Sequence, residues 1–275
     1  MAGRDDFERV LLRDVVKEKK RELVQFDTDT LVKKALDVLM QEQILAAPVY
    51  DREKGMYVAF TSVFDITAYL TWKLESNGVV CMREALSFPL GRICPGYSAE
   101  AQSGMWIFRD DASVAQVLEP LGKGVHRVLV LPSSAAGGAP MVLTQTDVAR
   151  YILLEREAMV ERYPALSQTL EDLGFGEALQ PVVRVSKNVT AREALVKLFS
   201  SGQSALAVVE DRTTLLATLS PTDLRGVNPY ALEELERPVL AYLARRHGGA
   251  IPVPVCAQLG DTLLAVFERM AAGVA

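Results

Sequence analysis

The sequence predicts an α/β protein built from tandem repeats of about 45 residues, and three observations carry this prediction. Four segments resemble one another, and each starts with Asp or Asn and continues with apolar residues at helical spacing. Two short apolar runs follow each of the first three segments, and a hydroxyl-rich tetrapeptide that ends in Asp follows the second run. Since one such unit cannot bury its apolar faces alone, we expect the units to pair sheet against sheet, with helices outside.

The first helix of each repeat is predicted from the four similar segments. They start at Asp29, Asp111, Asn188 and Asp261. In each, a short polar side chain precedes an apolar stripe, which is typical of an N-capped amphipathic helix. We therefore expect these four residues to cap their helices.

The apolar runs predict two strands in each of the first three repeats. The first strands are expected at residues 46–50, 127–131 and 205–209. The second strands are expected at residues 56–60, 140–143 and 215–219.

The tetrapeptides predict where the last helix of each repeat begins. They are Ser62-Val-Phe-Asp65, Thr144-Gln-Thr-Asp147 and Ser220-Pro-Thr-Asp223. Their aspartates follow the first residue of the repeat by 36, 36 and 35 positions. The same offset from the start of the fourth segment would fall near position 297, beyond the last residue, so we expect the fourth repeat to be truncated.

Composition and charge argue against several classes of function. The net charge of -5 and the isoelectric point near 5.3 give no general attraction to nucleic acid or anionic lipid. The one basic run, Lys17 to Arg21, is interrupted by Glu18 and is interpreted as the solvated face of a helix. The chain shows no Gly-rich phosphate loop, nucleophile elbow or cluster of metal ligands, so we expect neither an enzyme nor a metal protein.

Cysteine usage and the N-terminus suggest a compartment. Cys81, Cys94 and Cys256 are odd in number and far apart, which suits a reducing cytosol or nucleus. The first residues are acidic where a secretory signal is basic and then apolar, and no apolar run is long enough to span a bilayer. We expect a protein of the cytoplasm, and also of the nucleus, that is not associated with a membrane.

The repeats resemble the CBS domain in several places. The resemblance rests on Phe26-Asp-Thr-Asp-Thr-Leu-Val-Lys-Lys-Ala-Leu36, Ala46-Ala-Pro-Val-Tyr-Asp51, Gly124-Val-His-Arg-Val128 and Ser204-Ala-Leu-Ala-Val-Val-Glu-Asp211. The pattern of four repeats resembles the gamma regulatory subunit of AMP-activated protein kinase and its relatives. This implies β-α-β-β-α units that pair into Bateman-type modules, repeat one with repeat two, and repeat three with the truncated fourth.

Six segments follow from this organisation. They are repeat one (8–75), a linker (76–106), repeat two (107–160), a linker (161–180), repeat three (181–230) and the N-terminal part of repeat four (231–275). The missing half of repeat four is expected to leave apolar surface exposed, which could drive formation of a homodimer.

The resemblance implies that adenine nucleotides bind in clefts between paired repeats. A carboxylate at a helix start can accept hydrogen bonds from ribose hydroxyls, and Asp65, Asp147 and Asp223 match the aspartate with that role. His126 and Arg127 match a dipeptide that contacts phosphates. The neighbouring hydroxyl positions are Ser62, Thr144, Thr146, Ser204, Ser220 and Thr222. The alternative for the residues before each helix is simple N-capping.

Four positions bear on which of these predicted sites could bind a nucleotide. Leu45 stands where the animal subunit has an arginine, and Phe64 replaces the hydroxyl before the first aspartate. Asp147, in contrast, stands where the animal subunit lacks the ribose aspartate. His247 precedes two glycines that end a helix, so C-terminal capping is its expected role.

Two functions remain open at this point. In the first, the chain is a non-catalytic regulatory subunit that binds AMP, ADP or ATP, without a metal, and joins the catalytic and scaffold subunits of a protein kinase complex. In the second, the repeats are a scaffold that acts without a ligand. They differ in whether Asp147 and Asp223 face an open site or merely cap their helices.

Overall fold

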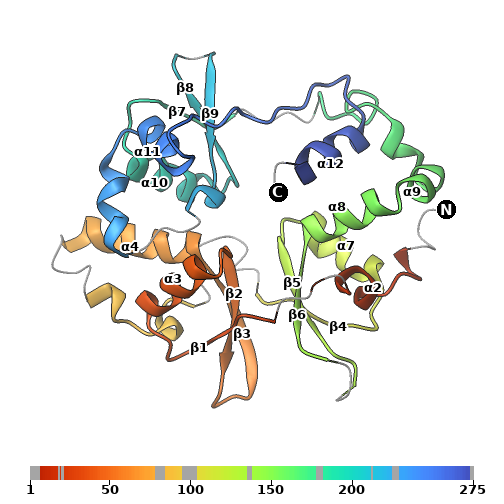
Figure 1. Ribbon diagram of the computed structural model, residues 1–275, viewed down its shortest axis with the longest axis horizontal. Coiled ribbons are helices and arrows are strands. Elements are labelled where there is room, and N and C mark those ends of the chain that lie inside the picture. Colours follow the sequence, from red (N-terminus) through yellow and green to blue (C-terminus); the bar gives the residue numbers. More distant parts are fainter. Residues whose placement is uncertain are drawn as a thin grey trace. The chain divides into compact units, whose positions relative to one another are not determined.

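The computed structural model describes most of the chain as a series of small sheets with helices beside them (Figure 1). The described residues are 7–17, 19, 22–77, 84–94, 104–134, 138–177, 182–211, 213–224 and 229–272. Cys81 and the middle of the predicted 76–106 linker lie outside them.

Repeat one shows the expected unit. Its elements are β1 (Phe26–Asp27), α3 (Val32–Gln41), β2 (Ala46–Asp51), β3 (Met56–Ser62) and α4 (Val63–Asn77). β2 pairs with β1 in parallel and with β3 in antiparallel, which gives the order β1-β2-β3. Helix α3 forms because its apolar residues recur every three or four positions, and four of them are buried: Val32, Ala35, Leu36 and Leu39.

Repeats two and three show the same unit and the same strand order. Repeat two comprises β4 (Ile107–Arg109), α7 (Val114–Gly122), β5 (Arg127–Leu131), β6 (Met141–Thr144) and α8 (Gln145–Leu154). Repeat three comprises β7 (Arg184–Ser186), α10 (Ala191–Ser201), β8 (Leu206–Val209), β9 (Leu215–Leu219) and the 3-10 helix η3 (Pro221–Leu224). The predicted α/β class of tandem repeats is confirmed.

Short helices lie in the segments that precede, connect or follow the repeats. They are α2 (Leu12–Val16), η1 (Leu90–Arg92), α9 (Arg156–Arg162), η2 (Pro164–Ser167), η4 (Pro229–Glu236) and α11 (Val239–Arg246), and the fourth repeat contributes α12 (Leu263–Ala272). In all four repeats the residue before the first helix forms a single β-bridge to a connecting segment. The bridges are Leu11 to Ser113, Leu31 to Pro89, Thr169 to Thr262 and Thr190 to Pro238.

The predicted caps of the first helices are wrong. Helices α3, α7 and α10 start three positions after Asp29, Asp111 and Asn188, because those residues lie in the turn between strand and helix. The N-cap positions are Leu31, Ser113 and Thr190, and only Thr190 among these accepts a capping hydrogen bond with its side chain. In the fourth repeat α12 starts two positions after Asp261, so the alignment of that segment is shifted by one.

The chain forms two compact units, each with its own core. One unit joins repeat one to repeat three (Val24–Met105 and Val182–Pro254), and their buried residues form a single hydrophobic cluster. Phe64, which replaces a hydroxyl in the motif, packs on Phe199 with a ring-centroid separation of 4.4 Å. The shared core of repeats one and three was not predicted.

The other unit holds repeat two, the N-terminal segment and the fourth repeat (Met1–Leu23, Trp106–Pro181 and Val255–Ala275). Its core includes Leu12, Val16, Val128 and Leu264, from three separate parts of the chain. The expected pairings were of repeat one with repeat two and of repeat three with repeat four. Each would join one unit to the other, and both remain predictions.

The described ranges contain neither a helix that could span a membrane nor a cluster of metal ligands. None of their helices is both long and apolar enough to cross a bilayer. They also contain no group of three or more His, Cys, Asp and Glu side chains that could hold a metal ion.

Candidate functional site

Each predicted aspartate caps the helix on which it lies. The backbone N–H of Thr144 donates to Asp147 Oδ2 (2.7 Å), and the backbone N–H of Asp147 donates to Thr144 Oγ1 (3.3 Å). Ser62 and Asp65 form a similar pair, as do Ser220 and Asp223. Capping therefore accounts for one carboxylate oxygen in every repeat, and a ligand site depends on the other oxygen and on the surrounding charges.

Repeat two brings the predicted cationic residues to its aspartate. Arg127 starts β5, and its backbone pairs in register with Thr144 at the end of β6. The backbone N–H of Gln145 donates to His126 O (3.1 Å), and His126 Nδ1 lies 3.2 Å from Gln145 Oε1. His126 is exposed and Arg127 is half-buried, and the side chain of His126 lies at the start of α8. Thr146, the second residue of α8, is also half-buried.

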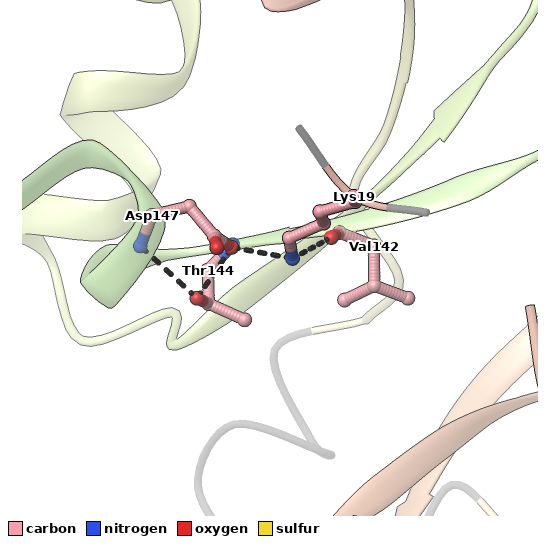
Figure 2. A network of polar contacts seen from close by, with 4 residues as sticks. All are labelled: Lys19, Val142, Thr144 and Asp147. Atoms are coloured by element: carbon pink, nitrogen blue, oxygen red, sulfur yellow. Dashed lines mark hydrogen bonds and ion pairs between the residues drawn. The ribbon is translucent and has the colours of Figure 1, made fainter. Parts of the chain in front are cut away.

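An unpredicted lysine completes this cluster (Figure 2). Lys19 Nζ donates to Asp147 Oδ2 and to Val142 O, both at 2.7 Å. The interpretation of residues 17–21 as a solvated helix face is wrong for Lys19. Helix α2 ends at Val16, and the ammonium group of Lys19 binds Asp147 of repeat two. Within the part of the chain that the structure describes, Asp147 Oδ1 has no hydrogen-bond partner. The side chain of Asp147 is 11% exposed.

Repeat three has a similar aspartate but no open oxygen. Asp223 Oδ2 accepts from the N–H of Ser220 (2.7 Å), and Asp223 Oδ1 lies 2.9 Å from His247 Nε2. Tyr242 Oη donates to the backbone oxygen of Asp223, and burial raises the pKa of Tyr242 to about 12. Thr222 Oγ1 lies 2.5 Å from Ser220 Oγ. A ribose at Asp223 would therefore compete with His247 for Oδ1, whereas Asp147 Oδ1 has no such neighbour among the described residues.

The expected capping role of His247 is confirmed, and its side-chain contact is new. The residue follows the last turn of α11, and its N–H donates to Leu243 O (3.1 Å). Gly248 and Gly249 have φ angles of 71° and 96°, which glycine adopts without a steric penalty. The side chain is then free to turn toward Asp223, 24 positions earlier in the chain.

In repeat one the aspartate is buried, and apolar residues stand at the start of β2 where repeat two has His126 and Arg127. The positions that correspond to His126 and Arg127 are Leu45 and Ala46, because Ala46 pairs in register with Ser62 and the N–H of Val63 donates to Leu45 O. Asp65 is 4% exposed. Burial, followed by the charge of Asp65, raises the pKa of Cys94 to about 12. These surroundings are poorly suited to a phosphate.

Repeat three also lacks the two cations. Leu206 pairs with Leu219, so Ser204 and Ala205 occupy the positions of His126 and Arg127. Ser204 is exposed and offers one hydroxyl group. Among the described residues of the three complete repeats, only repeat two combines a His-Arg pair at the strand start with an aspartate whose second oxygen is open.

The architecture is that of a tandem CBS-repeat protein. Protein MJ1225 from Methanocaldococcus jannaschii, described as a candidate archaeal homologue of gamma-AMPK, superposes with a TM-score of 0.67 over 96% of this chain and 90% of that one. Its sequence is 15% identical to this chain, so the likeness shows the fold alone.

Similar sequences are found among fungal proteins named SDS23. The protein from Yarrowia lipolytica is 26% identical over 232 residues, which cover 80% of this chain and 45% of the relative. The protein from Aspergillus clavatus is 24% identical over 237 residues, which cover 82% of this chain and 44% of the relative. The chain thus spans less than half the length of these relatives. No family model matches the chain.

Proposed function

We propose that the chain is a non-catalytic regulatory protein that binds AMP, ADP or ATP at repeat two. The observation that carries this proposal is the open Oδ1 atom of Asp147 at the start of α8, where His126 contacts Gln145 and the backbone of Arg127 pairs with Thr144. A carboxylate oxygen accepts ribose hydroxyl groups, and Arg127 and the N–H donor of His126 suit the phosphates that follow the ribose. The likeness in fold to a candidate archaeal homologue of gamma-AMPK supports a regulatory role of this kind.

The regulatory mechanism in this proposal is differential binding. AMP, ADP and ATP share the adenosine and differ in phosphate charge, so Arg127 and His126 would distinguish them. A ligand shifts an equilibrium only if a partner prefers one bound state. We further propose that the partners are the catalytic and scaffold subunits of an AMP-activated-type protein kinase, and that the complex acts in the cytoplasm or nucleus.

The alternative function is a scaffold that needs no ligand. It is favoured by repeat three, where capping and His247 together account for both oxygens of Asp223. In this alternative the ion pair between Lys19 and Asp147 only stabilises the fold of repeat two. A homodimer is compatible with either function and stays a prediction.

Calorimetric titration of the purified chain with AMP, ADP and ATP tests the proposed function. We expect saturable binding with a stoichiometry near one, because only repeat two combines the required groups, and we expect Arg127→Ala to narrow the differences among the three nucleotides. Arg109→Ala provides a matched control, because Arg109 ends β4 and its guanidinium donates to Pro132 O at the other end of the sheet. A well-folded chain that gives no heat with any of the nucleotides would support the scaffold instead.

A further inference from the structure

We infer that Lys19, which lies outside repeat two, contacts the ribose in the candidate site and makes that site selective for ribonucleotides. This inference rests on the proposed function and adds a ligand-binding residue to it. Lys19 precedes β1, the first strand of repeat one, yet its ammonium group lies 2.7 Å from Asp147 Oδ2.

The hydrogen-bonding capacity of this ion pair is only partly used. An ammonium group has three N–H donors, and Lys19 spends two of them on Asp147 Oδ2 and Val142 O. Neither the ammonium group of Lys19 nor Asp147 Oδ1 makes any further hydrogen bond to the described residues. One donor and one acceptor are therefore left side by side on the same ion pair.

An adjacent donor and acceptor fit a vicinal diol better than a phosphate. A hydroxyl group both donates and accepts, so one ribose hydroxyl can donate to Asp147 Oδ1 while the other accepts from Lys19. A phosphate oxygen only accepts, and the carboxylate would repel it. Loss of either ribose hydroxyl leaves one of these two charged groups without its partner, which is the condition for strong discrimination.

Lys19 is held in position by the segment before it and by the contacts of its own ammonium group. Before it, the N–H of Leu12 donates to Ala112 O (2.9 Å), and Leu11 bridges to Ser113. Its second anchor, Val142 O, belongs to β6, so the ammonium is fixed to the strand that leads into Asp147. The side chain of Lys19 remains 33% exposed, which leaves its ammonium accessible to a ligand.

Repeat three offers an internal comparison. His247 follows the bridging residue Pro238 by nine positions, and Lys19 follows Leu11 by eight. Both residues thus come from a connecting segment and reach the aspartate that opens a helix. They differ because His247 takes the Oδ1 atom of Asp223, whereas Lys19 leaves the Oδ1 atom of Asp147 open.

The test is to titrate Lys19→Met and the wild-type chain with AMP, 2′-deoxy-AMP and 3′-deoxy-AMP. The wild type should bind each deoxynucleotide about tenfold more weakly than AMP, because each lacks one charge-assisted hydrogen bond. Lys19→Met should weaken AMP binding by about tenfold and abolish the preference over one deoxynucleotide, the one without the hydroxyl that accepts from Lys19, while the preference that depends on Asp147 remains. Lys19→Arg keeps N–H donors and should retain part of the lost preference.

Lys17→Met is the matched control, since Lys17 is exposed on the same segment and makes no contact with Asp147. It should behave as the wild type. An unchanged preference of Lys19→Met for AMP over both deoxynucleotides, or tighter binding of AMP, would overturn the role of Lys19 while leaving the proposed function intact. Failure of the wild type to bind any of the three nucleotides would instead overturn the proposed function, and this inference with it.

Discussion

Replacement of Asp147 by Ala is expected to weaken AMP binding by about 100-fold or more. The hydrogen bond from the ribose to Asp147 Oδ1 would be lost, and Lys19, without its ion-pair partner, would no longer be held in position for the second ribose hydroxyl. Each of these charge-assisted hydrogen bonds is worth about 1.5–3 kcal/mol, and about 1.4 kcal/mol corresponds to a tenfold change in affinity. The same change removes the cap of α8 and the partner of Lys19. Calorimetry measures the affinity, and thermal unfolding measures the accompanying loss of stability.

Two further variants separate binding from folding. Asp147→Asn retains an acceptor for the N–H of Thr144 but has no charge for Lys19, so it should fold well and still lose AMP binding. Asp223→Ala removes an equivalent cap and the contact to His247, so it should lower stability and leave AMP affinity unchanged. Equal losses of affinity in the Asp147 and Asp223 variants would contradict the assignment of the site to repeat two.

Replacement of Leu195 by Ala is expected to destabilise repeat one as well as repeat three. Leu195 lies on α10, is fully buried, and belongs to the core that both repeats share. A buried Leu→Ala change costs about 2–5 kcal/mol, a large share of the roughly 5–15 kcal/mol that stabilises a typical domain. Since one core serves both repeats, they should unfold together.

Hydrogen exchange followed by mass spectrometry resolves this effect along the chain. Leu195→Ala should reduce amide protection in β8 of repeat three and in β2 of repeat one, with less change in β5 of repeat two. The solvent-exposed Glu210→Gln variant is the control and should leave protection as in the wild type. Loss of protection confined to β8 would show that repeats one and three fold independently.

Local sequence patterns were sufficient to predict most secondary structure. The strands Arg127–Leu131 and Leu215–Leu219 have the predicted bounds, because β-branched and apolar runs between turn residues depend little on distant contacts. The caps of the first helices were misplaced, since Asp29 and Asp111 are equally suited to the turn that precedes the helix. Boundaries of this kind depend on backbone geometry that composition does not specify.

Long-range features were not predictable from the sequence. The contact between Phe64 and Phe199 unites two repeats that are separated by all of repeat two. Lys19 reaches Asp147 across 128 positions, and a basic run gives no sign of which lysine will leave the solvent. The motif identified the aspartates, whereas Lys19 and His247, which bind Asp147 and Asp223, come from connecting segments outside the motif.

The most direct test of the account is a crystal structure of the chain grown with AMP. The account predicts one nucleotide in the repeat-two site, with its ribose within hydrogen-bonding distance of Asp147 Oδ1 and its phosphate near Arg127. A nucleotide bound at Asp65 or Asp223 instead, or no nucleotide at saturating AMP, would contradict the claim that repeat two is the ligand site.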